Sequence, residues 1–286
     1  FLEFPEVECA ALCDVDSNVL EKRAKETEEI SGKRPRLYKD FRKLLDQKDI
    51  DAVINHSREK GVERILLPKI DTSTIEPLSN LVQRFPDMLL PMMGLHPTSV
   101  NADYHKQLEI IFKELKQENY VAVGEIGIDL YWDKTHYKEQ VKAFEAQIDV
   151  AIDMDLPIVV HARDSFDAIL EVLHKYNGST LKGVLHSFTG NQDQAQQAID
   201  LGFHLGVGGI STFKNSGVGE IIANQPLERL ILETDSPYLA PTPKRGKRNE
   251  SAYVCYVAEK LAELKKKPIQ EIEKITTANA QKLFKL

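Results

Sequence analysis

The sequence predicts an α/β protein built as a TIM-type (β/α) barrel, preceded by a partial Rossmann-like βαβαβ segment. From about residue 62, short β-branched or apolar runs alternate with amphipathic helical patterns. This alternation favours a parallel sheet with right-handed crossovers. Histidine or a carboxylate ends several of the runs, and strand ends that converge on one site are typical of a barrel rather than of an open doubly wound sheet.

Seven apolar runs predict the barrel strands. Two of the segments between them, 138–154 and 166–175, carry apolar residues at the three- and four-residue spacing of helices. The Pro- and Gly-rich stretch 237–246 is expected to be a loop inside this domain, because periodic structure resumes at Ser251. The predicted strands cover residues 62–67, 88–95, 121–126, 156–160, 183–186, 203–207 and 229–233.

Residues 1–53 have a pattern of their own, with strands expected at 7–12, 36–38 and 50–54 and helices at 18–29 and 41–45. The phrases ALCDVD and LYKDFRKLLDQKDIDAV resemble the middle of the nucleotide-binding domain of the Gfo/Idh/MocA oxidoreductases. The GxGxxG turn that binds pyrophosphate in such domains does not occur in residues 1–53. No cofactor-binding residue is therefore predicted, and an NAD-dependent oxidoreductase is the weakest functional alternative. The predicted domains are a 1–53 nucleotide-binding fragment and a 54–286 barrel.

The composition excludes several classes of protein. With 286 residues, 42% hydrophobic and 28% charged, the chain is expected to be globular rather than disordered. It has no apolar run near the roughly 20 residues of a membrane-spanning helix and no secretory signal in residues 1–20, so a cytoplasmic location without a membrane partner is expected. The three cysteines form no CxxC pair, which argues against zinc fingers. A net charge of −7 argues against a protein that coats nucleic acid, but it permits an enzyme with a local basic patch.

Four side chains at the ends of predicted strands suggest a metal-dependent hydrolase: Glu125, His161, His186 and Asp235. Imidazole and carboxylate together suit Mg, Mn or Zn, and a carboxylate shared by two ions lets both polarise one oxygen and one water. A single histidine at a strand end is as readily a packing residue. Four such residues on near-successive strands of a barrel point at the same volume, which favours the metal site.

Seven phrases occur in the order found in the TatD-like metal-dependent hydrolases: GLHPTSV, GEIGIDLYWD, LPIVVHARD, LHSFTG, GVGGISTFK, LETDSPYLAP and RGKRNE. The resemblance runs from about residue 54 to the C-terminus. It implies a deoxyribonuclease-like enzyme that hydrolyses phosphodiester bonds in DNA or a nucleotide with two divalent ions. By motif, it implies that Glu125 bridges the ions, that His161 and His186 bind one of them, and that Asp235 binds the other and helps to deprotonate the attacking water.

One departure concerns the second ion. The family begins with a strand that ends in a His-x-His phrase, and no His-x-His occurs in this chain. The resemblance therefore implies that the first barrel strand is missing or replaced by the partial Rossmann-like βαβαβ segment. The second site is therefore expected to be weakened, and a catalytically impaired TatD-like barrel is the main alternative function. Asp14 and Asp16 have the same i, i+2 spacing as the missing histidines. The favoured interpretation is nevertheless that Asp14 is a relic of ribose recognition and Asp16 a helix cap.

Further residues are predicted to contact the substrate. A dense basic cluster follows Asp235 and is expected to capture phosphate groups, with a solvated basic surface as the alternative. His96 is predicted either to bind substrate or to buttress its loop, and Tyr131 with Trp132 could offer a stacking face for a base. The sequence leaves the oligomeric state open. The basic cluster consists of Lys244, Arg245, Lys247 and Arg248.

Overall fold

The computed structural model describes residues 11–13, 17–31, 34, 36–38, 49–117 and 119–286. The chain divides into two compact units, residues 1–56 and 57–286. The predicted boundary between residues 53 and 54 stays a prediction. Asp14, Asp16 and the predicted helix at 41–45 lie outside the described residues.

The described part of the first unit begins with two short parallel strands joined by a helix. Strand β1 (Ala11–Cys13) pairs with β2 (Arg36–Tyr38), and helix α1 (Ser17–Ser31) connects them. The predicted strand at 50–54 is wrong, because this segment begins helix α3 (Asp49–Glu59). Its apolar residues Ile50, Val53 and Ile54 recur at the i, i+3, i+4 spacing of a helix rather than at every second position.

The second unit contains one parallel sheet whose seven strands follow each other in chain order from β3 to β9. This confirms the TIM-type α/β fold. In the part of the chain that the structure describes, the two outer strands β3 and β9 each pair with a single neighbour, so the barrel is open between them. The strands are β3 (Ile65–Lys69), β4 (Leu89–Met93), β5 (Val123–Asp129), β6 (Ile158–Arg163), β7 (Gly183–Leu185), β8 (His204–Val207) and β9 (Leu230–Leu232).

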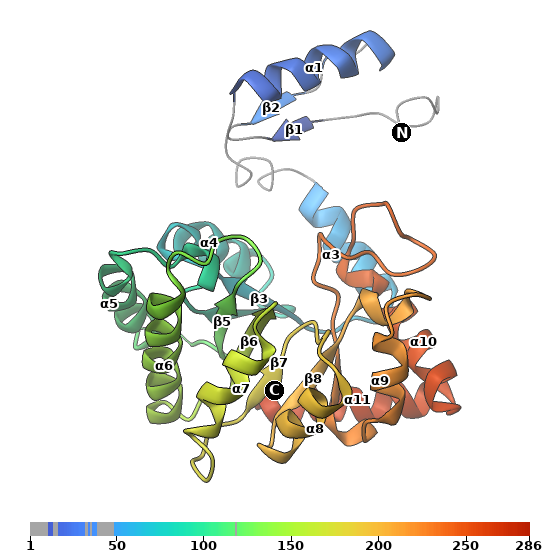
Figure 1. Cartoon of the computed structure of the whole chain (residues 1–286). Helices are drawn as coiled ribbons and strands as arrows, with labels where there is room; N and C mark the ends of the chain where they lie inside the picture. Colours follow the sequence, from blue (N-terminus) through green and yellow to red (C-terminus); the bar gives the residue numbers. More distant parts are fainter. Residues whose placement is uncertain (1–10, 14–16, 32–33, 35, 39–48, 118) are drawn as a thin grey trace. The chain divides into compact units, whose positions relative to one another are not determined.

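Helices follow the strands and lie around the outside of the curved sheet (Figure 1). No helix among the described residues is long and apolar enough to cross a membrane. The helices of this unit are α4 (Ile75–Arg84), α5 (Tyr104–Leu115), α6 (Tyr137–Asp153), α7 (Phe166–His174), α8 (Gln192–Asp200), α9 (Val218–Asn224), α10 (Val254–Lys265) and α11 (Ile269–Phe284).

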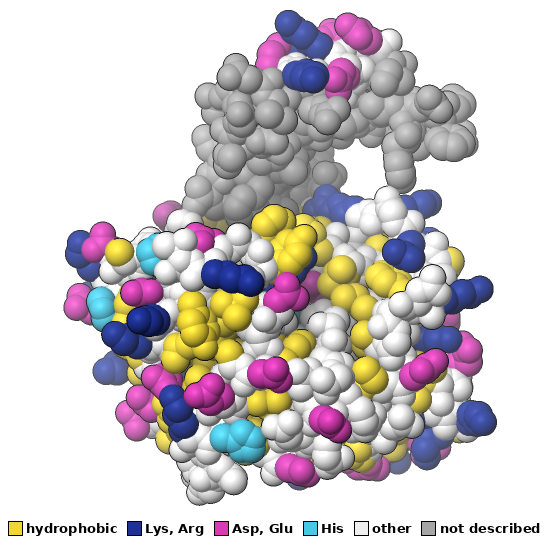
Figure 2. All heavy atoms as spheres, in the orientation of Figure 1, with side chains coloured by type: hydrophobic (Ala, Val, Ile, Leu, Met, Phe, Trp, Pro, Cys, Tyr) yellow, Lys and Arg dark blue, Asp and Glu magenta, His cyan; other side chains and the backbone are white. Residues whose placement is uncertain are grey.

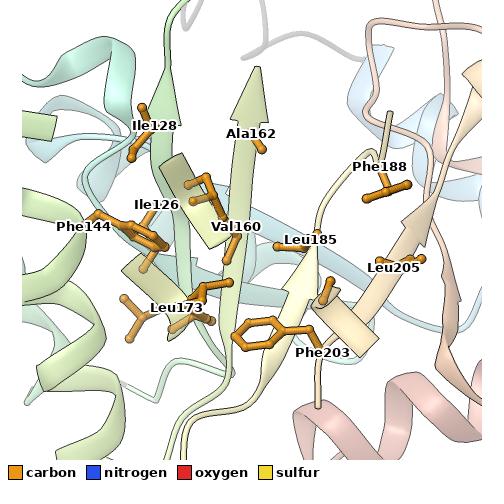
Figure 3. Close-up of a cluster of buried hydrophobic side chains, with 14 of the residues drawn as sticks. Ile126, Ile128, Phe144, Val160, Ala162, Leu173, Leu185, Phe188, Phe203 and Leu205 are labelled. Carbon is orange, nitrogen blue, oxygen red and sulfur yellow. The ribbon is translucent and has the colours of Figure 1, made fainter. Parts of the chain in front are cut away.

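A continuous apolar core joins the strands to these helices. Figure 3 shows Phe144 of α6 beside Ile126 of β5, with Val160 of β6 and Leu185 of β7 further along the same cluster. All four side chains are completely buried. Because neighbouring strands are parallel, this core fixes their carboxyl ends at one edge of the sheet, and the loops that leave those ends must gather there.

The described surface mixes charges of both signs. Figure 2 shows Lys and Arg side chains interspersed with Asp and Glu over the visible face, without a broad field of one sign. On this face the molecule therefore has no extended basic surface of the kind that coats nucleic acid, in agreement with the net charge of −7.

Candidate metal centre

Glu125 occupies a bulge in β5. Its neighbours Gly124 and Ile126 pair with the consecutive residues Val159 and Val160 of β6, so Glu125 has no partner in the ladder. A side chain at Gly124 would meet Val159, since a Cβ there would lie 2.6 Å from the Cβ of Val159. Glycine thus allows β5 to approach β6 closely at the point where the bulge turns the Glu125 carboxylate into the site.

Histidines and carboxylates from five strands or the residues that follow them meet around Glu125. Glu125 and His161 lie inside β5 and β6 rather than at the strand ends that the sequence predicted, whereas His96, His186 and Asp235 follow β4, β7 and β9. Its Oε2 lies 3.8 Å from His96 Nε2, and its Oε1 lies 3.9 Å from His186 Nε2. The same His186 nitrogen is 3.6 Å from Asp235 Oδ1. The rings of His96 and His161 pack edge to face, with centroids 4.4 Å apart. The structure therefore brings together all four predicted ligands, and it adds His96.

These distances fit a metal site. Ligand atoms of His96, Glu125 and His161 all lie within 4.8 Å of one another. Nitrogen and oxygen ligands bound at about 2.0–2.2 Å to one ion are separated by roughly 3–4 Å, and the contacts around Glu125 fall in that range. His96, predicted as a substrate ligand, is thus also placed to bind metal.

Two carboxylates that the sequence analysis did not single out hold the histidines in place. Asp129 Oδ2 lies 2.9 Å from His161 Nε2, and Glu233 Oε2 lies 3.0 Å from His186 Nδ1. The other Glu233 oxygen accepts a 2.7 Å hydrogen bond from the backbone N–H of Ser187. A carboxylate on one ring nitrogen fixes the orientation of a histidine whose other nitrogen binds metal. The signal for both residues was present in the phrases GEIGIDLYWD and LETDSPYLAP, a few positions from Glu125 and Asp235.

The pKa values of His96 and His186 are shifted in opposite directions. Burial, reinforced by neighbouring His161, lowers the pKa of His96 to about 3, so its imidazole is neutral at pH 7. Burial also disfavours the charged form of His186, but the carboxylates of Glu233 and Glu125 outweigh it and raise the pKa of His186 well above its ordinary value. Burial raises the pKa of Glu125. Without a cation, a protonated His186 therefore compensates the buried carboxylates.

Comparison with known proteins identifies the family. Residues 38–285 match the family described as TatD related DNase. The chain belongs to this family. It is 37% identical over 239 residues to the metal-dependent hydrolase YabD of Bacillus subtilis, which covers 83% of this chain and 93% of YabD. It is 31% identical over 245 residues to the 3'-5' ssDNA/RNA exonuclease TatD of Salmonella typhimurium, covering 84% and 94% of the two chains.

Solved structures agree with the TatD assignment. The crystal structure of YjjV, a TatD homologue from Escherichia coli, superimposes with a TM-score of 0.75 and 29% identity, and the match covers 83% of this chain and 92% of YjjV. The prediction of a TatD-type metal-dependent hydrolase with a TIM-type fold is confirmed. The TatD match begins at residue 38, within the stretch where the sequence analysis expected a resemblance to an oxidoreductase, and these comparisons do not support that resemblance. The comparisons thus favour the hydrolase over the impaired barrel and the oxidoreductase.

In this TatD protein the predicted basic cluster lies on a loop tied to the segment of Asp235. The side-chain amide of Asn249 donates 2.6 Å hydrogen bonds to the carbonyl oxygens of Thr234 and Tyr238. Arg245 packs over the ring of Phe213 at 4.1 Å, and Lys244 lies 5.4 Å from the centre of the Tyr253 ring. Two of the four basic side chains thus lie against aromatic rings, whereas Arg245, Lys247 and Arg248 are exposed.

Proposed function

We propose that this protein is a divalent-metal-dependent phosphodiesterase that acts on nucleic acid, with Glu125, His161, His186, Asp235 and His96 around the metal. The convergence of these side chains on Glu125 is the observation that supports the proposal. Membership of the TatD related DNase family and the exonuclease name of the Salmonella relative favour a nucleic acid substrate.

Two ions sharing Glu125 are the proposed metal content, with Mg, Mn or Zn as the candidates. The two Glu125 oxygens face different histidines, His96 and His186, as expected of a bridging carboxylate. The ion beside Asp235 is proposed to bind more weakly, because the chain has no His-x-His phrase to add to that site. When bound, the metal would polarise the phosphoryl oxygen and lower the pKa of a water molecule.

Asp235 is the proposed acceptor for the proton of the attacking water. Its side chain is 29% exposed, whereas those of Glu125 and His186 are 15% and 12% exposed, so Asp235 is the most accessible carboxylate of the centre. The more deeply buried side chains serve to hold the metal. Lys244, Arg245, Lys247 and Arg248 are proposed to bind backbone phosphates from the loop that follows Asp235.

The test is hydrolysis by the purified full chain, with single-stranded DNA and with the simple diester bis(p-nitrophenyl) phosphate. Both activities are expected to disappear with chelator, to return with Mg or Mn, and to be lost in Glu125→Gln. The matched control is Glu171→Gln, which removes the charge of an exposed carboxylate on α7. Cleavage that survives exhaustive chelation, or an unimpaired Glu125→Gln variant, contradicts the proposal.

A further inference from the structure

Two large aromatic side chains are exposed directly after β5, on the loop that leaves the metal centre. Tyr131 is 53% exposed and Trp132 is 70% exposed. Such residues bury 150–250 Å² each when they find a partner, so their exposure side by side indicates a binding surface.

A third side chain orders the pair. The two rings lie 5.0 Å apart and nearly perpendicular, and the Arg163 guanidinium lies 3.9 Å from the Tyr131 ring centre and 5.4 Å from that of Trp132. Arg163 follows His161 by two residues on β6, so both project from the same side of that strand. We call Tyr131, Trp132 and Arg163 the aromatic platform.

One carboxylate connects the aromatic platform to the metal centre. Asp129 Oδ2 holds His161, while its Oδ1 accepts hydrogen bonds from the backbone N–H groups of Tyr131 (3.0 Å) and Trp132 (3.3 Å). Burial opposes ionisation of Asp129, but these hydrogen bonds, that of His161 foremost, lower its pKa. The platform is therefore held in a fixed register with a metal-binding histidine.

A small cavity is lined by one residue of the platform, Trp132. Its walls also include Asp129, Pro97 and Thr98. The hydroxyl of Thr98 lies 2.7 Å from His96 Nδ1, so the cavity borders a second side chain of the centre. A group seated against Trp132 in this cavity would lie beside Asp129, the carboxylate that holds His161.

We propose that the aromatic platform stacks an unpaired nucleobase of a substrate whose phosphate is held at the metal centre. This inference rests on the proposed phosphodiesterase function and adds a base-binding subsite to it. Aromatic side chains stack on any base because every base has a π-face, whereas a base inside a duplex has its faces covered by its neighbours. The cationic guanidinium of Arg163 adds to the stack and to attraction for the phosphate.

Binding is measured without catalysis, on the metal-free full chain with chelator present. Trp132 is the single tryptophan of the chain, so all tryptophan fluorescence reports on the platform. An oligothymidylate of about eight nucleotides is expected to quench this fluorescence, and an abasic oligonucleotide of equal length and charge is not. Equal quenching by both oligonucleotides, or no quenching by either, contradicts the proposal that the platform stacks a base.

Variants of Trp132 measure how much the aromatic platform contributes to the affinity for an oligonucleotide. Loss of one base stack is expected to weaken binding of labelled oligothymidylate in Trp132→Leu by about 5- to 150-fold, with Trp132→Phe largely restoring it. Ile110→Ser, which changes an exposed apolar residue on α5, is the control and is expected to bind normally. Equal affinity in Trp132→Leu and the unmodified chain overturns the inference.

Hydrolysis separates this inference from the proposed function. The first outcome is that the chain cleaves bis(p-nitrophenyl) phosphate, while Trp132→Leu and the unmodified chain cleave oligothymidylate equally well. In that case base stacking by the platform is refuted, and the proposed phosphodiesterase function is retained. If neither substrate is cleaved with any metal, the proposed function fails, whereas quenching by the base-bearing oligonucleotide still establishes the platform.

Discussion

Glu233→Gln is the sharpest test of how the metal centre is organised, because it removes one charge and almost no volume. Glu233 lies behind His186, with Oε2 3.0 Å from Nδ1 and Oε1 bonded to the Ser187 N–H. It is also the strongest of the neighbours that raise the pKa of His186. The amide retains an acceptor for Ser187 but no longer stabilises a positive imidazolium.

The expected effect follows from the role of this carboxylate. Replacing the hydrogen-bonding partner of a metal-binding histidine typically lowers metal affinity by about 10- to 100-fold, or roughly 1.4–2.7 kcal/mol. A hydrogen bond to a charged group contributes about 1.5–3 kcal/mol, which is the same order. The loss of negative charge also lowers the pKa of His186. A smaller fraction of His186 is therefore protonated before the metal binds, and fewer protons are released when it binds.

Calorimetric titration with Mn measures both quantities, the affinity directly and the released proton from the dependence of the heat on buffer ionisation enthalpy. Glu171→Gln is the matched control, with unchanged affinity and proton release. A Glu233→Gln variant that binds Mn as tightly as the unmodified chain would refute the view that Glu233 orients His186.

Four further predictions concern the pH dependence of metal binding, the space beside Glu233, an ion pair of Asp155 and the packing of the core. Because metal must displace the proton that Glu233 and Glu125 hold on His186, Mn affinity is expected to fall as pH decreases, which titrations across pH 6–8 would show and a flat profile would contradict. Gly206→Ala places a Cβ 2.4 Å from Glu233 Oε2, so this carboxylate must move and Mn affinity should drop; unchanged affinity means that the side chain adapts without cost. Hydrogen bonds from Lys182 and Lys285 lower the pKa of Asp155 from 3.8 to about 2, so their stabilisation is complete above about pH 4 and fades as pH falls towards 2; acid unfolding of Asp155→Asn should lack this dependence, and an identical acid profile counts against it. Phe144→Ala is expected to lower the free energy of unfolding by about 3–5 kcal/mol, measured with denaturant, and a loss below about 1 kcal/mol would mean that the core closes around the gap.

Local periodicity was sufficient to predict the order of the barrel elements. All seven strands from β3 to β9 lie where short apolar runs alternate with helical patterns, because burial of a parallel sheet under helices requires such runs. The same reasoning failed at 50–54, where a short apolar group is compatible with either period. The helix α3 extends to Glu59, and only this longer segment distinguishes the two.

The sequence by itself singled out Glu125, His161, His186 and Asp235 as candidate metal ligands, since imidazole and carboxylate groups bind divalent metals and each of these residues follows an apolar run. Only the tertiary structure decided that His96 joins them and that Asp129 and Glu233 stand behind the histidines. Sequence order says which strand carries a side chain, but not the distance between groups 47 residues apart, such as His186 and Glu233. That distance depends on strand register, on the β5 bulge and on the space left by Gly206, all of which packing between strands fixes.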